Sequence, residues 1–226
     1  MENLKNNKLL NIFKKKVFNP QDFGYDFYWA TRKPGMEFER HRQIVQFIDD
    51  GDSVVDLACG DGRLLFNITK QLPNTQVSGV DVSQTAIDYC TERGLTVDKG
   101  NIDDSEFTLE GQYDHIVISE ALEHIVNPED LLRKLHNNFN KSIIVTIPNT
   151  GYFMHRLSLL LGTFPVQWIH HPAEHLRFWT HSDFKHTLKI LGYHKHRLHS
   201  IKGVGFLQRI WPSMFSAQTL FILEKA

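Results

Sequence analysis

The sequence predicts an α/β fold, with a mostly parallel sheet of seven strands, helices on both faces and an antiparallel last strand. Short apolar runs typical of buried strands alternate with amphipathic segments typical of helices from residue 53 to residue 148. The chain has 226 residues, of which 41% are hydrophobic, and this suffices for one such domain but not for two large ones.

Residues 1–36 are predicted to form an N-terminal extension. Its basic beginning, KNNKLLNIFKKKVF, fits either a frayed terminal helix or a segment that lies on a membrane surface or a partner. Its aromatic part, YDFYWATR, is expected either to fold over a bound ligand as a lid or to cover the sheet as ordinary core. The domain itself is predicted over residues 37–226, and it begins with a helix at 37–50 that Gly51 ends.

The remaining elements follow from apolar periodicity and from residues that start and stop helices. Ser83 is expected to cap one helix, and Pro128 to lie in the first turn of the next. We predict strands at residues 53–58, 76–82, 95–100, 113–119, 141–148, 193–201 and 216–225, and further helices at 62–71, 84–93, 127–139 and 181–191. The alternation implies right-handed crossovers, whereas the last strand follows no long crossover and is therefore expected to be antiparallel.

A glycine-rich turn follows the first strand, in the segment VVDLACGDGRLL. Such a turn lets backbone N–H groups approach an anionic group at a helix N-terminus. A dinucleotide-binding pattern is disfavoured, because Arg63 would take the place of the third glycine, where the helix must pack closely on the strand. The spacing instead fits acid-x-G-x-G-x-G, the signature of S-adenosylmethionine methyltransferases, through Asp56, Ala58, Gly60 and Gly62, with Ala58 replacing the first glycine.

A second acid strengthens the case for S-adenosyl-L-methionine as the cofactor. Asp81 ends the second predicted strand, 19 residues after Gly62, where an acid reaches the ribose hydroxyls of a nucleoside bound over the first strand. Asp56 would then hold the ammonium group of the cofactor. The alternative is that both acids only cap loops and that the turn is an ordinary one. The glycine-rich turn, the two acids and the alternation of strands with helices together predict a Rossmann-like methyltransferase domain.

From about residue 37 onward the chain resembles class I methyltransferases, and in particular the MetW-type family of methionine biosynthesis. VVDLACGDGRLL, IVTIPNTGYFMHRLSLLLG and WPSMFSAQTLFIL carry this resemblance, whereas SEALEHIVNP looks more like the small-molecule and quinone O-methyltransferases. The resemblance implies that Asn101 and Ile102 lie beside the adenine and that Ser119 flanks the cofactor. Val82, next to Asp81, and Tyr28 of the aromatic segment are also assigned to cofactor binding.

Methyl transfer to a hydroxyl requires a base as well as alignment of the acceptor. His124 is the leading candidate, because it follows the fourth strand at the carboxyl edge of the sheet and because histidine is the residue type best suited to exchange a proton near neutral pH. It could instead be a helix-start histidine that bonds to backbone. Glu120 and Glu123 are expected to bind the acceptor or the cofactor, and Glu120 is assigned to the acceptor. The alternative is that both only favour the positive N-terminal end of the next helix.

The aromatic, histidine-rich stretch at about 149–180 is predicted to be a substrate-side insertion. We expect His155, His175 and Arg177 to line a pocket for a polar or anionic acceptor, the alternative being that they are plain surface residues. No metal site is expected, because the sequence holds no HExxH or paired Cys/His spacing.

Composition narrows the functional classes further. The net charge of −1 and the lack of a basic stripe argue against nucleic acid as the main partner. No apolar run could span a bilayer, no signal peptide is recognised, and two cysteines form no disulfide framework, so a cytoplasmic setting is expected. We predict methyl transfer to an oxygen of a small molecule or saccharide precursor, the alternative being a MetW-type accessory protein that partners an acyltransferase. The oligomeric state is left open.

Overall fold

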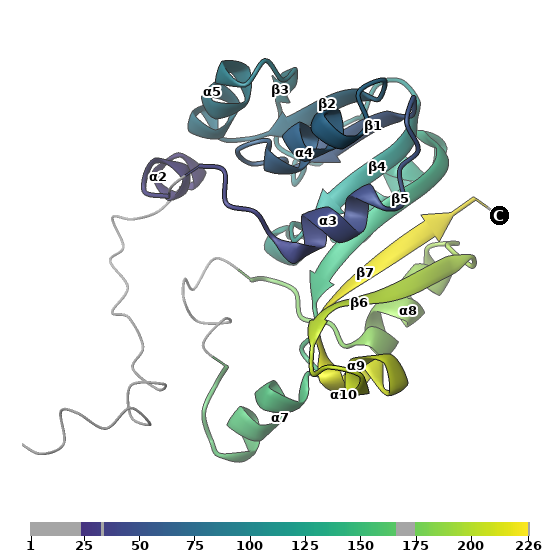
Figure 1. Ribbon diagram of the computed structural model, residues 1–226. Coiled ribbons are helices and arrows are strands. Elements are labelled where there is room, and N and C mark those ends of the chain that lie inside the picture. Colours follow the sequence, from purple (N-terminus) through teal and green to yellow (C-terminus); the bar gives the residue numbers. More distant parts are fainter. Residues whose placement is uncertain (1–23, 33, 166–174, 226) are drawn as a thin grey trace, which may run out of the picture.

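The computed structural model describes residues 24–32, 34–165 and 175–225 (Figure 1). Its sheet has seven strands in the order β3-β2-β1-β4-β5-β7-β6. The strands are β1 (Ser53–Leu57), β2 (Gln76–Asp81), β3 (Val97–Lys99), β4 (Tyr113–Ser119), β5 (Phe139–Pro148), β6 (His196–Gly203) and β7 (Ser216–Glu224). Strand β7 is antiparallel to both of its neighbours, and the other pairs are parallel. The predicted sheet, including its antiparallel last strand, is confirmed.

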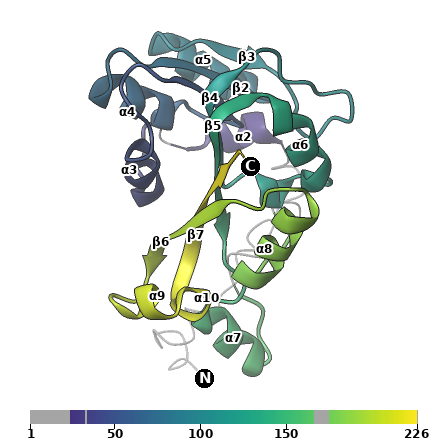
Figure 2. The same cartoon turned by 90° about the vertical axis from the view of Figure 1, so that its right-hand side faces the viewer.

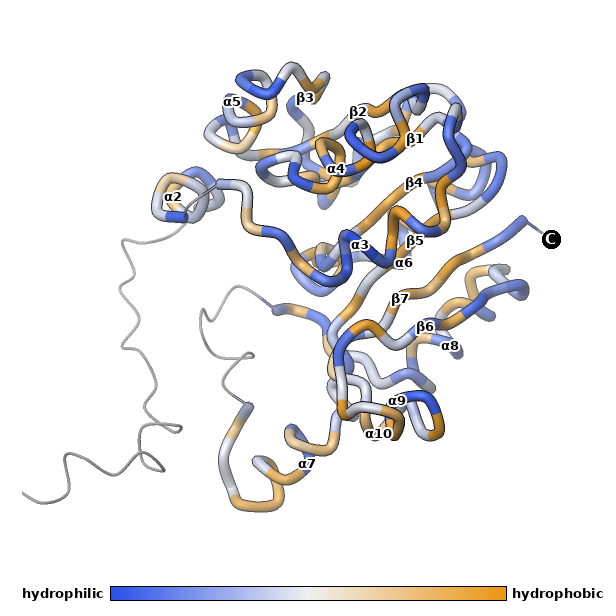
Figure 3. The backbone as a smooth tube through the Cα atoms, viewed as in Figure 1, coloured by the Kyte–Doolittle hydropathy of each residue, from blue (hydrophilic) through white to orange (hydrophobic). Residues whose placement is uncertain are grey.

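Helices cover both faces of this sheet (Figure 2). On one face, α6 (Pro128–Lys134) and α8 (His181–Ile190) pack on inward-facing side chains of β1, β4 and β5. On the other face, α3 (Glu39–Val45) and α4 (Arg63–Gln71) pack on β1, β4, β5 and β7, and α5 (Gln84–Glu92) packs beside α4. The central strands are apolar and the connecting loops polar (Figure 3). The core is therefore double-sided, as strands buried on both faces require.

Local chemistry sets the helix starts as predicted. The Ser83 side chain accepts a hydrogen bond from the Ala86 N–H (3.3 Å) and caps α5. Pro128 is the first residue of α6, whose cap is Asn127. Among the described residues, no helix is long and apolar enough to cross a membrane.

Two predicted helices are shorter in the structure. The helix expected at 127–139 ends at Lys134, continues as the 3-10 turn η2 (Leu135–Asn137), and gives way to β5 at Phe139. Phe139 pairs with Tyr113 in the sheet and is fully buried, so sheet pairing overrides the helical periodicity there. The helix expected at 37–50 spans only Glu39–Val45.

Four short helices had not been predicted as elements. They are α2 (Tyr25–Ala30), α7 (Phe153–Leu160) within the expected insertion, α9 (Leu207–Ile210) and α10 (Pro212–Phe215). The basic segment before residue 24 and the insertion residues 166–174, including His170 and His171, lie outside the described residues.

Candidate functional site

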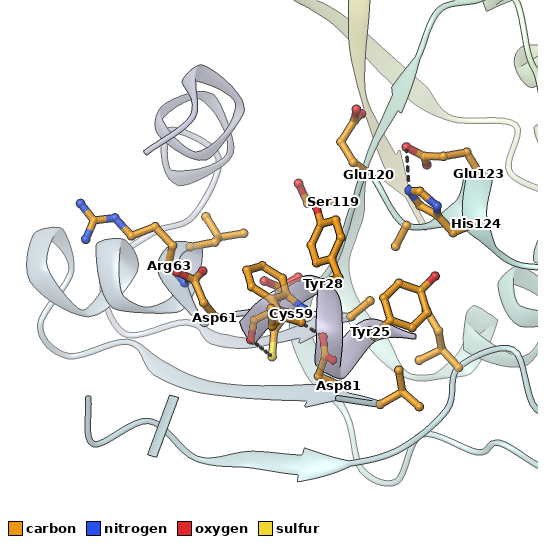
Figure 4. A pocket seen from close by; sticks show the side chains of 18 of the residues that line it. Tyr25, Tyr28, Cys59, Asp61, Arg63, Asp81, Ser119, Glu120, Glu123 and His124 are labelled. Atoms are coloured by element: carbon orange, nitrogen blue, oxygen red, sulfur yellow. Dashed lines mark hydrogen bonds and ion pairs between the residues drawn. The ribbon is translucent and has the colours of Figure 1, made fainter. Parts of the chain in front are cut away.

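A cleft of about 580 Å³ lies at the carboxyl ends of β1, β2 and β4. Ligands of open α/β sheets bind at this edge, where the connections on either side diverge. The glycine-rich turn, the tip of β2 and the aromatic helix α2 surround one end of the cleft, and Glu120, Glu123 and His124 gather at the other (Figure 4).

The glycine-rich turn is held by Asp81. Gly60 and Gly62 adopt left-handed φ angles of 57° and 68°, and the intervening backbone turns β1 into α4. The Asp81 Oδ2 atom accepts a hydrogen bond from the Gly60 N–H (2.7 Å), and its Oδ1 accepts one from the Ser83 N–H (2.9 Å). Burial nevertheless raises the pKa of Asp81. Asp81 therefore fixes the turn that a cofactor would approach.

Asp56 is a buried acid with an unused hydrogen-bonding atom. Asp56 lines the cleft and is only 2% exposed. Its Oδ1 atom has no hydrogen-bond partner among the described residues. Burial, together with the neighbouring charge of Asp81, raises the pKa of Asp56 to about 8. A cationic ligand group bound beside Asp56 would favour the ionised carboxylate and supply the missing partner.

Helix α2 lies over the glycine-rich turn. The Asp26 carboxylate accepts hydrogen bonds from the Ser83 hydroxyl (2.6 Å) and the Thr85 N–H (3.1 Å), which anchors α2 on the start of α5. The Trp29 ring stands so close to Gly60 that a Cβ at that position would overlap it. No residue of α2 is buried, so the aromatic segment is not part of the core, and Tyr25, Tyr28 and Trp29 line the cleft.

The opposite end of the cleft holds two acids and two histidines. Glu120 adopts a left-handed φ of 53°, and its N–H donates to the Thr146 carbonyl (3.1 Å). Glu123 is 1% exposed and its Oε1 lies 4.0 Å from His124 Nε2, while the rings of His124 and His175 meet edge to face at 4.8 Å. Burial raises the pKa of Glu123, and the charge of Glu120 raises it further, whereas burial lowers the pKa of His175.

The structure brings most of the predicted site residues to this one cleft. Those that line it are Tyr28, Asp56, Ala58, Gly60, Asp81, Val82, Asn101, Ile102, Ser119, Glu120, His124 and His175. His155 and Arg177 are not among the lining residues. His155 is buried with its Nδ1 3.2 Å from the Asn149 carbonyl oxygen, and Arg177 donates through Nε to the Val126 carbonyl (3.0 Å) and pairs with Glu129 at 3.6 Å.

Sequence reasoning did not identify Arg40 or His41, which line the cleft from the start of α3. The Arg40 guanidinium stacks over the Phe38 ring at 4.0 Å, and its charge opposes the burial that raises the pKa values of Asp56 and Glu120. Both residues precede the first strand, in a segment whose sequence has no motif, so no spacing signal marks them.

Curated relatives match part of this chain. The (S)-tetrahydroprotoberberine N-methyltransferase of Eschscholzia californica is 25% identical over 120 residues, which are 50% of this chain and 34% of that protein. The ubiquinone biosynthesis O-methyltransferase of Rickettsia bellii (strain OSU 85-389) is 28% identical over 123 residues, which are 51% of this chain and 48% of that protein. The chain thus spans between a third and a half of the length of these relatives.

The fold and the family agree with these partial matches. The crystal structure of an S-adenosylmethionine-dependent methyltransferase from Archaeoglobus fulgidus superposes with a TM-score of 0.63 at 17% identity, over 89% of this chain and 95% of that one, and so shares its fold. The family model described as methionine biosynthesis protein MetW matches residues 38–223. Because this match runs through nearly the whole domain, the chain belongs to the family of methionine biosynthesis protein MetW.

Proposed function

We propose that the protein is an S-adenosylmethionine-dependent methyltransferase that acts on an oxygen of a small molecule or saccharide precursor. The observation that carries the proposal is the buried side chain of Asp56 beside the glycine-rich turn, whose Oδ1 has no hydrogen-bond partner in the part of the chain that the structure describes. The methionine end of the cofactor has an ammonium group that matches this atom in charge and hydrogen-bonding capacity. Bound S-adenosylmethionine supplies an electrophilic methyl group on a sulfonium that is already a good leaving group.

The residues around the cleft fit the rest of the cofactor. Asp81 is assigned to the ribose hydroxyls, and Val82, Asn101 and Ile102 to the adenine, while Ser119 flanks the cofactor from the end of β4. Tyr28 and its neighbours on α2 act as a lid that excludes water, and an aromatic face also attracts a sulfonium cation. In this proposal residues 1–36 are an extension of the domain at 37–226, and that division stays a prediction.

An oxygen acceptor is favoured by the acids and histidines at the far end of the cleft. A hydroxyl must lose its proton to attack the methyl carbon, and His124, beside Glu123, is the proposed base. Glu120 and His175 line the same end and contact the acceptor. A cleft of about 580 Å³ is of the size that small-molecule ligands occupy. The named relatives include both an N- and an O-methyltransferase of small-molecule type.

Calorimetric titration of the full chain with S-adenosylmethionine, and in parallel with NADH, tests the cofactor. We expect binding of the first alone. Asp56→Ala and Asp81→Ala should each weaken it at least tenfold, about 1.4 kcal/mol, and Asp26→Ala, which releases the anchor of α2, by a smaller factor. The exposed Asp98→Ala is the matched control and should bind normally. If S-adenosylmethionine does not bind the wild-type protein, the proposal is wrong.

A second function is favoured by the family itself, since the match to MetW covers residues 38–223. The chain would then be an accessory protein that keeps the fold and supports a partner acyltransferase. Co-purification of a tight stoichiometric partner, with no methyl transfer to any offered hydroxyl or amine, would favour this role. Transfer to an amine alone would keep the methyltransferase and correct the acceptor atom.

A further inference from the structure

We propose that Glu123, His124 and His175 form a binding site for a divalent transition-metal ion at the acceptor end of the cleft. Each of the three offers one ligand atom, and these atoms all lie within 4.8 Å of one another. Nitrogen and oxygen ligands bind such ions at about 2.0–2.2 Å, so two ligands of one ion stand about 3–4 Å apart. Small rotations of the three side chains would bring their ligand atoms from the observed spacing to these distances around one ion.

Three buried polar atoms at this end of the cleft have no hydrogen-bond partner among the described residues. Glu123 is 1% exposed, yet its Oε2 has no hydrogen-bond partner among the described residues, and the same holds for His175 Nδ1 and Glu120 Oε1. Buried polar atoms are almost always paired, and such exceptions point to an ion or ligand. The 4.0 Å between Glu123 Oε1 and His124 Nε2 is too long for a hydrogen bond but leaves room for an ion between them.

The backbone holds the three ligands in register although they come from distant segments. His124 and Glu123 lie in the 3-10 turn η1 (Leu122–His124), and His175 lies more than 50 residues later in the chain. The Glu123 carbonyl accepts hydrogen bonds from the N–H groups of Leu176 (2.7 Å) and Arg177 (3.1 Å), which ties the two segments together. These backbone hydrogen bonds hold the segment that carries His175 beside Glu123.

The chemistry of the three ligands favours particular ions, and their number leaves a coordination position free for a reactant. Two imidazoles with one carboxylate suit Zn²⁺, Fe²⁺, Co²⁺ or Mn²⁺ better than Ca²⁺ or Mg²⁺, which favour oxygen ligands. Three protein ligands leave at least one position free, as in catalytic metal sites. That position faces the cleft, which all three residues line, and Glu120 lies beside it with its unpartnered carboxylate oxygen (Figure 4).

The role of this ion rests on the proposed methyl transfer, although its binding does not. The ion would lower the pKa of an acceptor hydroxyl that binds it, as zinc does for water. The hydroxyl proton passes to Glu120 and then to solvent, and the oxygen forms its bond to the methyl carbon as the carbon–sulfur bond of the sulfonium breaks. His124 is then a ligand and no longer the base of the preceding proposal.

Titration of the chelator-stripped full chain with Mn²⁺, followed by the electron paramagnetic resonance signal of the free ion, tests the site. We expect one ion per chain, at least tenfold weaker binding in Glu123→Gln and in His175→Ala, and unchanged binding in the control His186→Ala, an exposed histidine on α8. Circular dichroism and S-adenosylmethionine titration show whether each variant is folded. Co²⁺ should give the absorption bands of a nitrogen-ligated ion, which the variants lose.

The outcomes separate the two proposals. If the wild-type protein binds no Mn²⁺ or Co²⁺ up to millimolar concentrations, or if folded variants bind as tightly as the wild type, the metal site is wrong. In that case normal S-adenosylmethionine binding leaves the methyltransferase proposal standing, with His124 as its base. If the ion binds as expected and S-adenosylmethionine does not, the metal site stands and the methyltransferase proposal fails.

Discussion

The two ends of the same sheet each hold a buried acid–histidine cluster, and the two clusters differ in how completely they are paired. At the amino ends of the strands, Asp52 Oδ2 lies 2.9 Å from His115 Nε2, and Asp52 Oδ1 accepts from Lys141 Nζ at 2.6 Å. His115 Nδ1 lies 2.8 Å from the Ser142 hydroxyl. Each atom of the acid and of the imidazole that can form a hydrogen bond therefore has a partner.

At the carboxyl ends of the strands the hydrogen bonding of the acids and histidines is less complete. Glu120, Glu123 and His175 each have a buried polar atom without a partner among the described residues. A buried polar group that lacks a partner destabilises a fold, whereas a saturated network does not. Acids and histidines therefore occur in both clusters, and the two clusters differ in how far their hydrogen bonds are saturated.

The largest effect expected from this comparison is on stability at the saturated end. Asp52→Ala removes the shared partner of His115 and Lys141 and should lower the free energy of unfolding by about 3 kcal/mol. Urea denaturation followed by circular dichroism measures it. Asp98→Ala, at an exposed position, is the control and should change stability by less than about 0.5 kcal/mol. A loss as small as that of the control would mean that the network does not stabilise the fold.

At the carboxyl ends of the strands, replacing Asp56 is expected to raise the free energy of unfolding at high pH, whereas Asp52→Ala lowers it. Its pKa of about 8 in the folded protein lies far above the unfolded value of about 3.9. The folded state therefore keeps a proton that the unfolded state has lost, and stability falls as pH rises between these values. Asp56→Asn removes this titration, so the variant should gain on the order of 3 kcal/mol over the wild type at pH 8 relative to pH 5.

Denaturation of the variant and the wild type at pH 5 and at pH 8 measures this gain in stability. Titration with S-adenosylmethionine measures the effect of the same substitution on cofactor binding. The same Asp56→Asn variant should bind S-adenosylmethionine more weakly, because the amide cannot hold an ammonium group as a carboxylate does. If the stability difference between the variant and the wild type were the same at pH 5 and at pH 8, the raised pKa of Asp56 would be wrong.

Most of the fold could be predicted because its signals are local. Continuous apolar runs mark the strands, and the hydroxyl of Ser83 and the ring of Pro128 fix helix starts by contacts within one turn. The glycine-rich turn and Asp81 could be placed for the same reason, since the end of a strand and its spacing decide which edge of the sheet they reach.

The missed parts depend on contacts between distant segments. The proximity of His175 to Glu123 follows from backbone hydrogen bonds between the Glu123 carbonyl and the N–H groups of Leu176 and Arg177, and no periodicity encodes these. His155 and Arg177 are polar enough for a binding pocket, yet backbone carbonyls satisfy both. The docking of α2 depends on Asp26 and Ser83, which lie 57 residues apart. Polarity in the sequence therefore indicates candidates, and the tertiary contacts decide among them.

The smallest expected effect concerns backbone strain, which also gathers at the carboxyl edge. Among the described residues other than glycine, positive φ angles occur at Ala58 (60°) and Glu120 (53°), which follow β1 and β4. The left-handed conformation costs an alanine about 1–2 kcal/mol, whereas glycine loses about 0.5–1 kcal/mol of chain entropy on folding. Ala58→Gly should therefore stabilise the fold slightly, by less than about 1 kcal/mol.

The unfolding temperature of Ala58→Gly measures this stabilisation, and an alanine-to-glycine change within a helix is the matched control. Ala86 is fully buried in α5, so Ala86→Gly should destabilise by about 1 kcal/mol or more. The two alanine-to-glycine changes should thus differ in sign, because only Ala58 has a backbone that favours glycine. If both lower the unfolding temperature equally, Ala58 is not held in the left-handed region, and the carboxyl edge differs from the amino end in hydrogen-bond saturation alone.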